Sequence, residues 1–133
     1  MSDTTKMSGP VWDVRCCGAA GDGTTKDTAA LQGALDAASA AGGGTVRVPP
    51  GVYRTGTLYL RSRVRLHLDA GAVLRGSPDP ADYNADDVFP ENQVFSFEGV
   101  SGAHLLIGYR LEDVAITGRG TIDGNSAAFL GPI

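Results

Sequence analysis

The sequence predicts an all-β fold: a right-handed parallel β-helix (solenoid) with one N-terminal capping α-helix. Three observations predict it. A glycine-rich turn at residues 18–23 precedes a single amphipathic segment, which ends at the glycine run 42–44. After this run, the spacing of apolar residues changes from helical to alternating. The alternation then continues through short corners that contain glycine or proline, as expected for strands stacked coil upon coil.

The first elements are a strand at residues 11–14, the glycine turn and one helix. We expect the helix from about Asp27 to Ala40, because the apolar residues of this segment recur at helical spacing and form one stripe. These residues are Leu31, Ala34, Leu35 and Ala38. Asp27 or Thr25 can cap its N-terminus, where aspartate also complements the helix dipole. The glycine run ends the helix, since glycine tolerates a left-handed backbone.

The later elements are short strands. Residues 45–48 place valines on one face and an arginine on the other. In the next strand Val64, Leu66 and Leu68 face one way, and their neighbours Arg63, Arg65, His67 and Asp69 face the other. Further strands are expected at 57–60, 72–75, 105–107, 114–117 and 121–123. An antiparallel sandwich is disfavoured, because two-residue Asn-Gly or Asp-Gly hairpin turns between paired runs are scarce.

The composition is consistent with one turn-rich domain. The chain has 133 residues, 19 glycines and 7 prolines. We expect residues 1–10 to be a flexible tail, and residues 11–133 to form the cap and first coils of an incomplete β-helix domain. The net charge of −4 argues against nucleic-acid binding. The absence of a long apolar run argues against a membrane span, and no signal peptide is visible. The chain is thus expected to be cytoplasmic, or exported by a signal outside this sequence.

Cysteine and histidine give little indication of redox or metal chemistry. Cys16 and Cys17 are adjacent, which disfavours a disulfide between them, so we expect two reduced thiols, one buried and one near the surface. His67 and His104 lack partners at metal-ligand spacing. The Gly-x-Gly segments are not placed as in a dinucleotide-binding unit. Neither a metal nor a cofactor is therefore expected.

Five segments carry a family resemblance: residues 18–32, 42–53, 55–58, 64–77 and, above all, Val114-Ala-Ile-Thr-Gly-Arg-Gly-Thr-Ile-Asp-Gly124. In this order they resemble the N-terminal part of the family 28 glycoside hydrolases, the polygalacturonases and related pectin-degrading enzymes. The wider group is the pectate-lyase-like superfamily. The resemblance extends from about Val11 to Phe129. It implies a parallel β-helix and inverting hydrolysis of pectic polysaccharide that contains galacturonic acid.

The resemblance supplies no catalytic residue for this chain. Inversion needs two carboxyl functions about 6.5–9.5 Å apart around a water molecule. The family's catalytic motifs Asn-Thr-Asp, Gly-His-Gly and Arg-Ile-Lys are absent here, and the pair Asp86-Asp87 lies in a long excursion at residues 78–104. We therefore expect this chain alone to be catalytically inactive, and its status as an enzyme stays open.

The candidate substrate-binding residues lie in two places. Arg61, Arg63 and Arg65 could form an outward row that binds the carboxylates of an acidic polysaccharide. Glu91, Asn92 and Glu98 lie in or beside the excursion, which could form one wall of a sugar cleft. The alternative function is a structural or carbohydrate-binding β-helix module of a tail-spike-like or surface-fibre protein. In either case an uncapped C-terminal edge predicts possible self-association.

Overall fold

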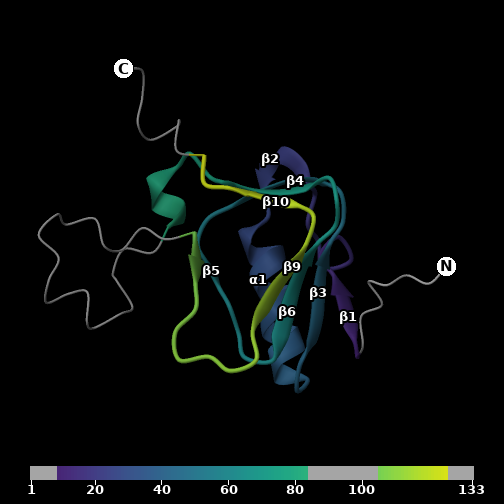
Figure 1. Cartoon of the computed structure of the whole chain (residues 1–133). Coiled ribbons are helices and arrows are strands. Elements are labelled where there is room, and N and C mark those ends of the chain that lie inside the picture. The colour runs from purple at the N-terminus through teal and green to yellow at the C-terminus, as the bar shows by residue number, and fades with distance from the viewer. Residues whose placement is uncertain (1–8, 84–104, 126–133) are drawn as a thin grey trace, which may run out of the picture.

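The computed structural model describes residues 9–83 and 105–125 (Figure 1). Before the helix, the chain forms β1 (Val11–Asp13) and β2 (Asp22–Lys26). Helix α1 (Thr28–Ala40) follows. The next strands are β3 (Gly44–Val48), β4 (Gly51–Thr55), β5 (Leu58–Tyr59), β6 (Val64–Leu68) and β7 (Ala72–Gly76). After the 3-10 turn Pro80–Asp82 come β8 (Leu106–Ile107), β9 (Ala115–Gly118) and β10 (Thr121–Asp123).

These strands form three sheets, and every strand pair in the described residues is parallel. The first sheet has the order β1-β3-β6-β9, the second β2-β4-β7-β10, and the third pairs β5 with β8. The chain visits the sheets in turn, so each strand pairs with its counterpart one coil away and not with its neighbour in sequence. The predicted parallel β-helix is confirmed.

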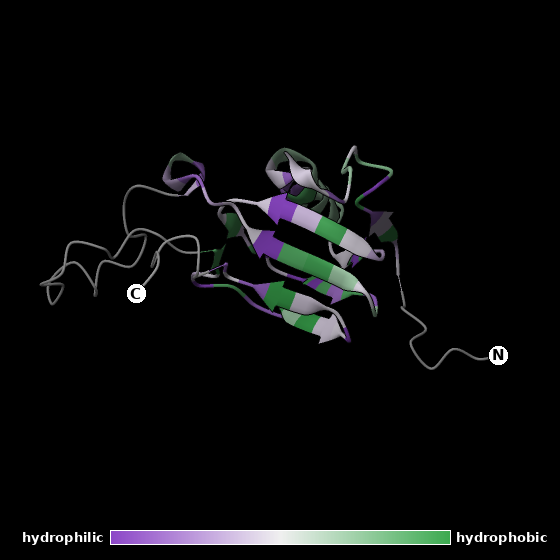
Figure 2. Cartoon of the chain, turned by 90° about the horizontal axis from the view of Figure 1, so that it is seen from above, coloured by the Kyte–Doolittle hydropathy of each residue, from purple (hydrophilic) through white to green (hydrophobic). Residues whose placement is uncertain are grey.

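Inward-facing residues stack from coil to coil in register. In the first sheet, Trp12, Val46, Leu66 and Ile116 are successive partners. Val46 and Leu66, in the middle of this column, are almost fully buried, whereas Ile116 at its end is 45% exposed. Figure 2 shows the resulting alternation of hydrophobic and hydrophilic residues along the strands. Burial of these aliphatic columns is the main favourable term in the stability of the stack.

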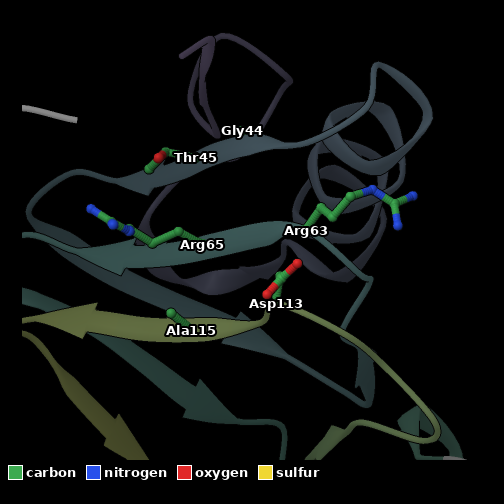
Figure 3. A pocket seen from close by; sticks show the side chains of 6 residues that line it. All are labelled: Gly44, Thr45, Arg63, Arg65, Asp113 and Ala115. Carbon is green, nitrogen blue, oxygen red and sulfur yellow. The ribbon is translucent and has the colours of Figure 1, made fainter. Parts of the chain in front are cut away.

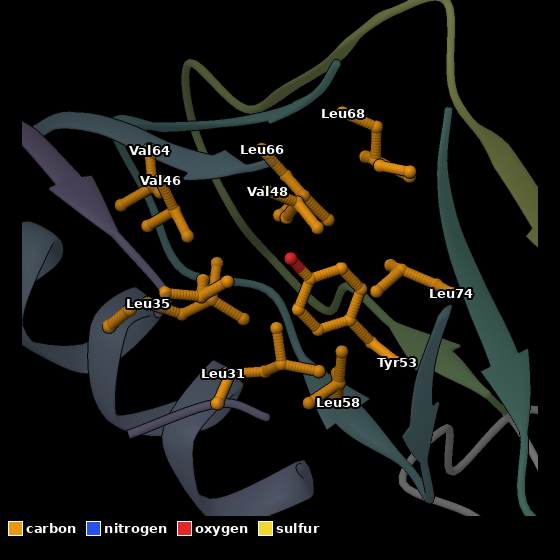
Figure 4. Packing of buried hydrophobic residues seen from close by; sticks show 14 of the residues in the cluster. Leu31, Leu35, Val46, Val48, Tyr53, Leu58, Val64, Leu66, Leu68 and Leu74 are labelled. Carbon is orange, nitrogen blue, oxygen red and sulfur yellow. The ribbon is translucent and has the colours of Figure 1, made fainter. Parts of the chain in front are cut away.

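Helix α1 supplies the apolar cover for the first coil. Its four predicted inward residues are all buried, and Leu31 and Leu35 lie against the same cluster as Val46, Tyr53 and Leu58 (Figure 4). The N-terminus differs in detail. Asp27 occupies the N-cap position, but its side chain makes no capping bond. Instead, its buried carboxylate accepts the backbone N–H groups of Ala20 (2.9 Å) and Gly21 (3.0 Å), which fixes the glycine turn against the helix.

Strands β2 and β4 were not predicted. In β4 the usual polarity is inverted, because Val52 faces outward while Tyr53 and Thr55 are fully buried. The buried Tyr53 hydroxyl donates to the Pro49 carbonyl oxygen at 2.8 Å and accepts from Arg15 Nε at 3.1 Å. These bonds satisfy a buried polar group that the alternation pattern assigns to the surface.

The prediction that one cysteine is buried was wrong, since both thiols are exposed. Val14 fills the inward position at the end of β1 and has no exposed surface. In the following turn the N–H of Cys16 donates to the Asp13 carbonyl oxygen and the N–H of Cys17 to that of Val14, and residues 15–18 are all exposed.

No helix within residues 9–83 and 105–125 combines the length and the apolar character that crossing a membrane requires.

Candidate functional site

Three residues with a left-handed backbone stack at the corner that leads into the first sheet. Gly43, Arg63 and Asp113 have φ values of 122°, 66° and 57°. Each directly precedes the segment that enters β3, β6 or β9, so the residues occupy equivalent places in successive coils. The backbone N–H of Arg63 donates to the Glu112 carbonyl oxygen at 2.9 Å, which ties two of these corners together. Glycine adopts this conformation readily, but arginine and aspartate do so at a cost.

A hollow of about 220 Å³ lies beside this corner, on the outer face of the first sheet (Figure 3). It is lined by Gly44, Thr45, Arg63, Arg65, Asp113 and Ala115. Arg65 is the register partner of Thr45 on one side and of Ala115 on the other, so a long cation stands between two short side chains. In Figure 3 the side chains of Arg63 and Arg65 point in different directions, with Asp113 near the corner.

The two arginines of the hollow differ electrostatically from most other basic residues of the described chain. Neither guanidinium has a hydrogen-bond or ion-pair partner among residues 9–83 and 105–125. Arg61, the expected third member of the row, instead donates from Nε to Asp36 on helix α1 at 2.8 Å. The predicted row of three is therefore split, and only Arg63 and Arg65 present available charge in the hollow.

The second sheet, by contrast, neutralises its outward cations. Lys26 Nζ lies 3.0 Å from Asp82 Oδ1, and Arg54 lies 3.8 Å from the other oxygen of the same carboxylate. The hydrogen bond from Ser77, followed by that from Lys26, lowers the pKa of Asp82. Further along, Arg75 lies 3.3 Å from Asp123. The second sheet therefore offers less free positive charge to an anion than the hollow does.

The far ends of the first-sheet strands are also internally paired. Arg47 bonds Asp69 through Nη2 at 2.6 Å, and His67 Nδ1 lies 2.8 Å from Thr117 Oγ1. The hydrogen bond to Asp69 raises the pKa of Arg47. His67 faces outward as predicted but is 9% exposed, because it packs between these neighbouring rungs. Within the described part of the chain, no three His, Cys, Asp or Glu residues are placed to hold a metal ion.

The structure brings together Arg63 and Arg65 from the predicted set. Glu91, Asn92 and Glu98, together with Asp86, Asp87 and His104, lie outside the described residues. Thr45 and Asp113 were not predicted as part of the hollow. Aligning residues 64–68 with 114–118 as successive rungs would have placed Asp113 over Arg63, and this alignment was the signal available in the sequence.

The three stacked parallel sheets define this molecule as a parallel β-helix protein. A sequence profile described as Rhamnogalacturonase A/epimerase, pectate lyase-like matches residues 11–118, most of the chain. The chain belongs to this family.

Three individual proteins that are similar to this chain give a more specific comparison. Exo-poly-alpha-D-galacturonosidase of Dickeya chrysanthemi is 36% identical over 94% of this chain and 21% of its own length. The structure of the Yersinia enterocolitica family 28 exopolygalacturonase matches 89% of this chain and 21% of that one, with 33% identity and a TM-score of 0.73. The A-module of the Azotobacter vinelandii mannuronan C-5 epimerase AlgE6 matches 88% and 29%, with 28% identity and a TM-score of 0.65.

These matches confirm the resemblance to family 28 glycoside hydrolases. The chain spans about a fifth of the length of the Dickeya and Yersinia relatives.

Proposed function

We propose that this chain is the N-terminal part of a polygalacturonase-like enzyme that cleaves pectic polysaccharide by inverting hydrolysis. The observation that carries the proposal is the similarity to an exo-poly-alpha-D-galacturonosidase over 94% of the chain. The available charge in the hollow supports the same substrate class, since galacturonic acid carries one carboxylate per sugar. A planar guanidinium matches a carboxylate with two parallel hydrogen bonds.

In this proposal, the chain supplies the first coils of the enzyme's β-helix and some of its substrate-binding residues. None of the motifs that carry acid–base chemistry in the family occurs at matching positions here. The purified 133-residue chain is therefore expected to release no reducing ends from polygalacturonate. An activity that releases reducing ends, co-purifies with the chain and is absent from a mock preparation of the same host would overturn this expectation. Sequencing the reading frame beyond Ile133 provides a second check, since continuation into Asn-Thr-Asp and Asp-Asp motifs supports hydrolysis.

The binding role is tested with Arg63→Gln and Arg65→Gln. Each change removes a cation that has no partner in the described chain, so we expect affinity for polygalacturonate to fall about tenfold, or about 1.4 kcal/mol. Arg75→Gln is the matched control, because Arg75 is similarly exposed but already paired with Asp123. Isothermal titration calorimetry measures the three affinities. Equal losses in all three variants would show a general charge effect and contradict a specific role for the hollow.

A second candidate is epimerisation of a uronic-acid polymer. It is favoured by the match to the mannuronan C-5 epimerase module over 88% of this chain. Hydrolysis creates a new reducing end for each bond broken, whereas epimerisation inverts a sugar carbon without shortening the polymer. Incubating the longest product of the gene with polygalacturonate and with polymannuronate separates the two. Reducing-end assays detect the first reaction, and proton NMR of the sugar C5 position detects the second.

A further inference from the structure

A second hollow, of about 230 Å³, lies on the outer face of the third sheet. It is lined by Tyr59, Leu60, Arg61, Ile107, Tyr109 and Leu111. In this sheet Leu58 pairs with Leu106, and Tyr59 with Ile107. The two leucines belong to or pack against the core, so the alternation turns Tyr59 and Ile107 to the opposite face, where Tyr59 is partly exposed and Ile107, at 3% exposed, forms the covered floor of the hollow. The bond from Leu60 N–H to Ile107 O (2.8 Å) continues this register toward Arg61 and Tyr109.

Each tyrosine ring in this hollow is accompanied by a guanidinium. The Arg61 guanidinium carbon lies 6.0 Å from the centre of the Tyr59 ring, and that of Arg110 lies 5.1 Å from the centre of the Tyr109 ring. Cation–π contacts of this kind restrain the ring orientation. A restrained ring loses less conformational entropy when a ligand packs on it, so the hollow is partly preorganised for a flat apolar surface.

Among the described residues, Arg61 is the one basic residue that lines this hollow, and its charge is already paired, unlike the charges of Arg63 and Arg65. Arg61 donates from Nε to Asp36 at 2.8 Å, and this bond helps to lower the pKa of Asp36 against the opposing effect of burial. A uronate carboxylate placed here would meet the Asp36 carboxylate as well as the guanidinium. Its net electrostatic gain would be small, and recognition must then come from the ring faces and the apolar lining.

We propose that the hollow at Tyr59 and Tyr109 binds a sugar ring of the same glycan through its C–H face, independently of the sugar's carboxylate. This inference rests on the proposed function for the identity of the glycan. The two hollows flank the corner at residues 60–63, one containing Arg61 and the other Arg63. The corner thus separates a surface that recognises charge from a surface that recognises ring shape.

The test is an NMR titration of the full 133-residue chain with two probes: an oligogalacturonide and its fully methyl-esterified form. Esterification removes the carboxylate charge but leaves the sugar rings. We expect both probes to shift the backbone amides of Tyr59, Leu60 and Tyr109, with affinities within about twofold of each other and little dependence on salt. Only the unesterified probe should shift the amides of Thr45 and Arg65.

Variants at the two rings sharpen the result. Tyr59→Leu and Tyr109→Leu keep apolar volume but remove the aromatic face, and we expect affinity for the esterified probe to fall roughly fivefold to tenfold. Tyr59→Phe and Tyr109→Phe keep the ring and should bind as the parent chain does. Dispersed amide spectra establish that each variant is folded.

Two outcomes would overturn the inference: no shifts at residues 59–61 and 107–111 with the esterified probe, or equal binding by the Leu and Phe variants. Shifts confined to Thr45 and Arg65 with the unesterified probe would remove this inference and leave the proposed function standing. The proposed function fails separately, if the longest product of the gene yields no reducing ends from polygalacturonate.

Discussion

Arg63 combines an unfavourable backbone conformation with an available charge. Its φ of 66° lies in the left-handed region, in a column where the preceding coil places Gly43. A non-glycine residue there costs about 1–2 kcal/mol. Strain of this kind is often retained where the side chain has a functional role. At Arg63 that role is the binding of an anion by the exposed guanidinium at the edge of the hollow, as proposed above.

Arg63→Gly should therefore stabilise the protein while weakening binding. Relief of the left-handed strain exceeds the roughly 0.5–1 kcal/mol lost to the greater freedom of glycine in the unfolded chain, so we expect a net gain of about 0.5 kcal/mol. Urea unfolding measures the change. Arg65→Gly is the control, because Arg65 lies within β6, where glycine only weakens the strand. Equal destabilisation in both variants would contradict the strain at Arg63.

Asp22 makes strand β2, which precedes the helix, sensitive to acid. Backbone hydrogen bonds, first from Thr25 and then from Thr24, lower the pKa of Asp22 from 3.8 to about 2. Because the folded-state pKa is depressed, the stabilisation is complete above the unfolded value near 3.8 and is lost as the pH falls toward 2. Asp22→Ala should thus be less stable than the parent chain at pH 6, and this difference should shrink as the pH falls from about 4 through 2. Urea midpoints across this range measure it, and a constant difference would contradict the assignment.

At the scale of elements, the aliphatic strands and the helix could be predicted from the sequence. The stripe from Leu31 to Ala38 and the alternation in β6 follow directly from the spacing of apolar residues. Strand β4 could not, because its buried residues Tyr53 and Thr55 carry hydroxyl groups, and some of the partners of these groups, Arg15 and Thr28, are distant in sequence. The hollow was only half predicted, because Asp113 is placed over Arg63 only when residues 64–68 and 114–118 are aligned as successive rungs, and the alternation of apolar residues alone does not fix that alignment.

Substitutions at two glycines, Gly118 and Gly33, test how closely successive coils pack. Gly118 ends β9 with φ 101°, and a Cβ there would overlap the carbonyl oxygen of Leu68 in the preceding coil. We expect Gly118→Ala to destabilise the protein by about 2–4 kcal/mol. Gly33 is exposed on helix α1 with open space around it, so Gly33→Ala should stabilise by about 0.5–1 kcal/mol.

Thermal unfolding followed by circular dichroism compares the two glycine variants. Similar melting temperatures for Gly118→Ala and the parent chain would show that β9 does not pack as closely on β6 as described.

At the scale of the whole molecule, the two ends of the stack are different. Helix α1 covers the inward residues of the first coil, while Ile116 and Ile122 at the other end are 45% and 42% exposed. Within the described residues, β9 pairs with β6 alone and β10 with β7 alone, so the other edge of each strand is unpaired. Unpaired strand edges beside apolar surface favour association with another chain.

The 133-residue chain is therefore expected to self-associate through the β9 and β10 edges. Light scattering should show an apparent mass that rises with concentration, and replacing Ile116 and Ile122 together by lysine should lower it at every concentration. Val11→Lys is the control, since Val11 is 46% exposed at the opposite edge of the first sheet. A mass that stays at one chain across the full range would contradict the prediction.

Helix α1 also limits the number of copies that can associate. Head-to-tail stacking, which would build open filaments, requires comparable apolar surfaces at both ends. The two ends are unequal, because α1 packs on the core at the first coil, where Val11 is exposed, whereas Ile116 and Ile122 are both exposed at the other end. We therefore expect two copies to meet mainly through the β9 and β10 ends, related by a two-fold axis, and the scattering mass to level off at twice that of the monomer.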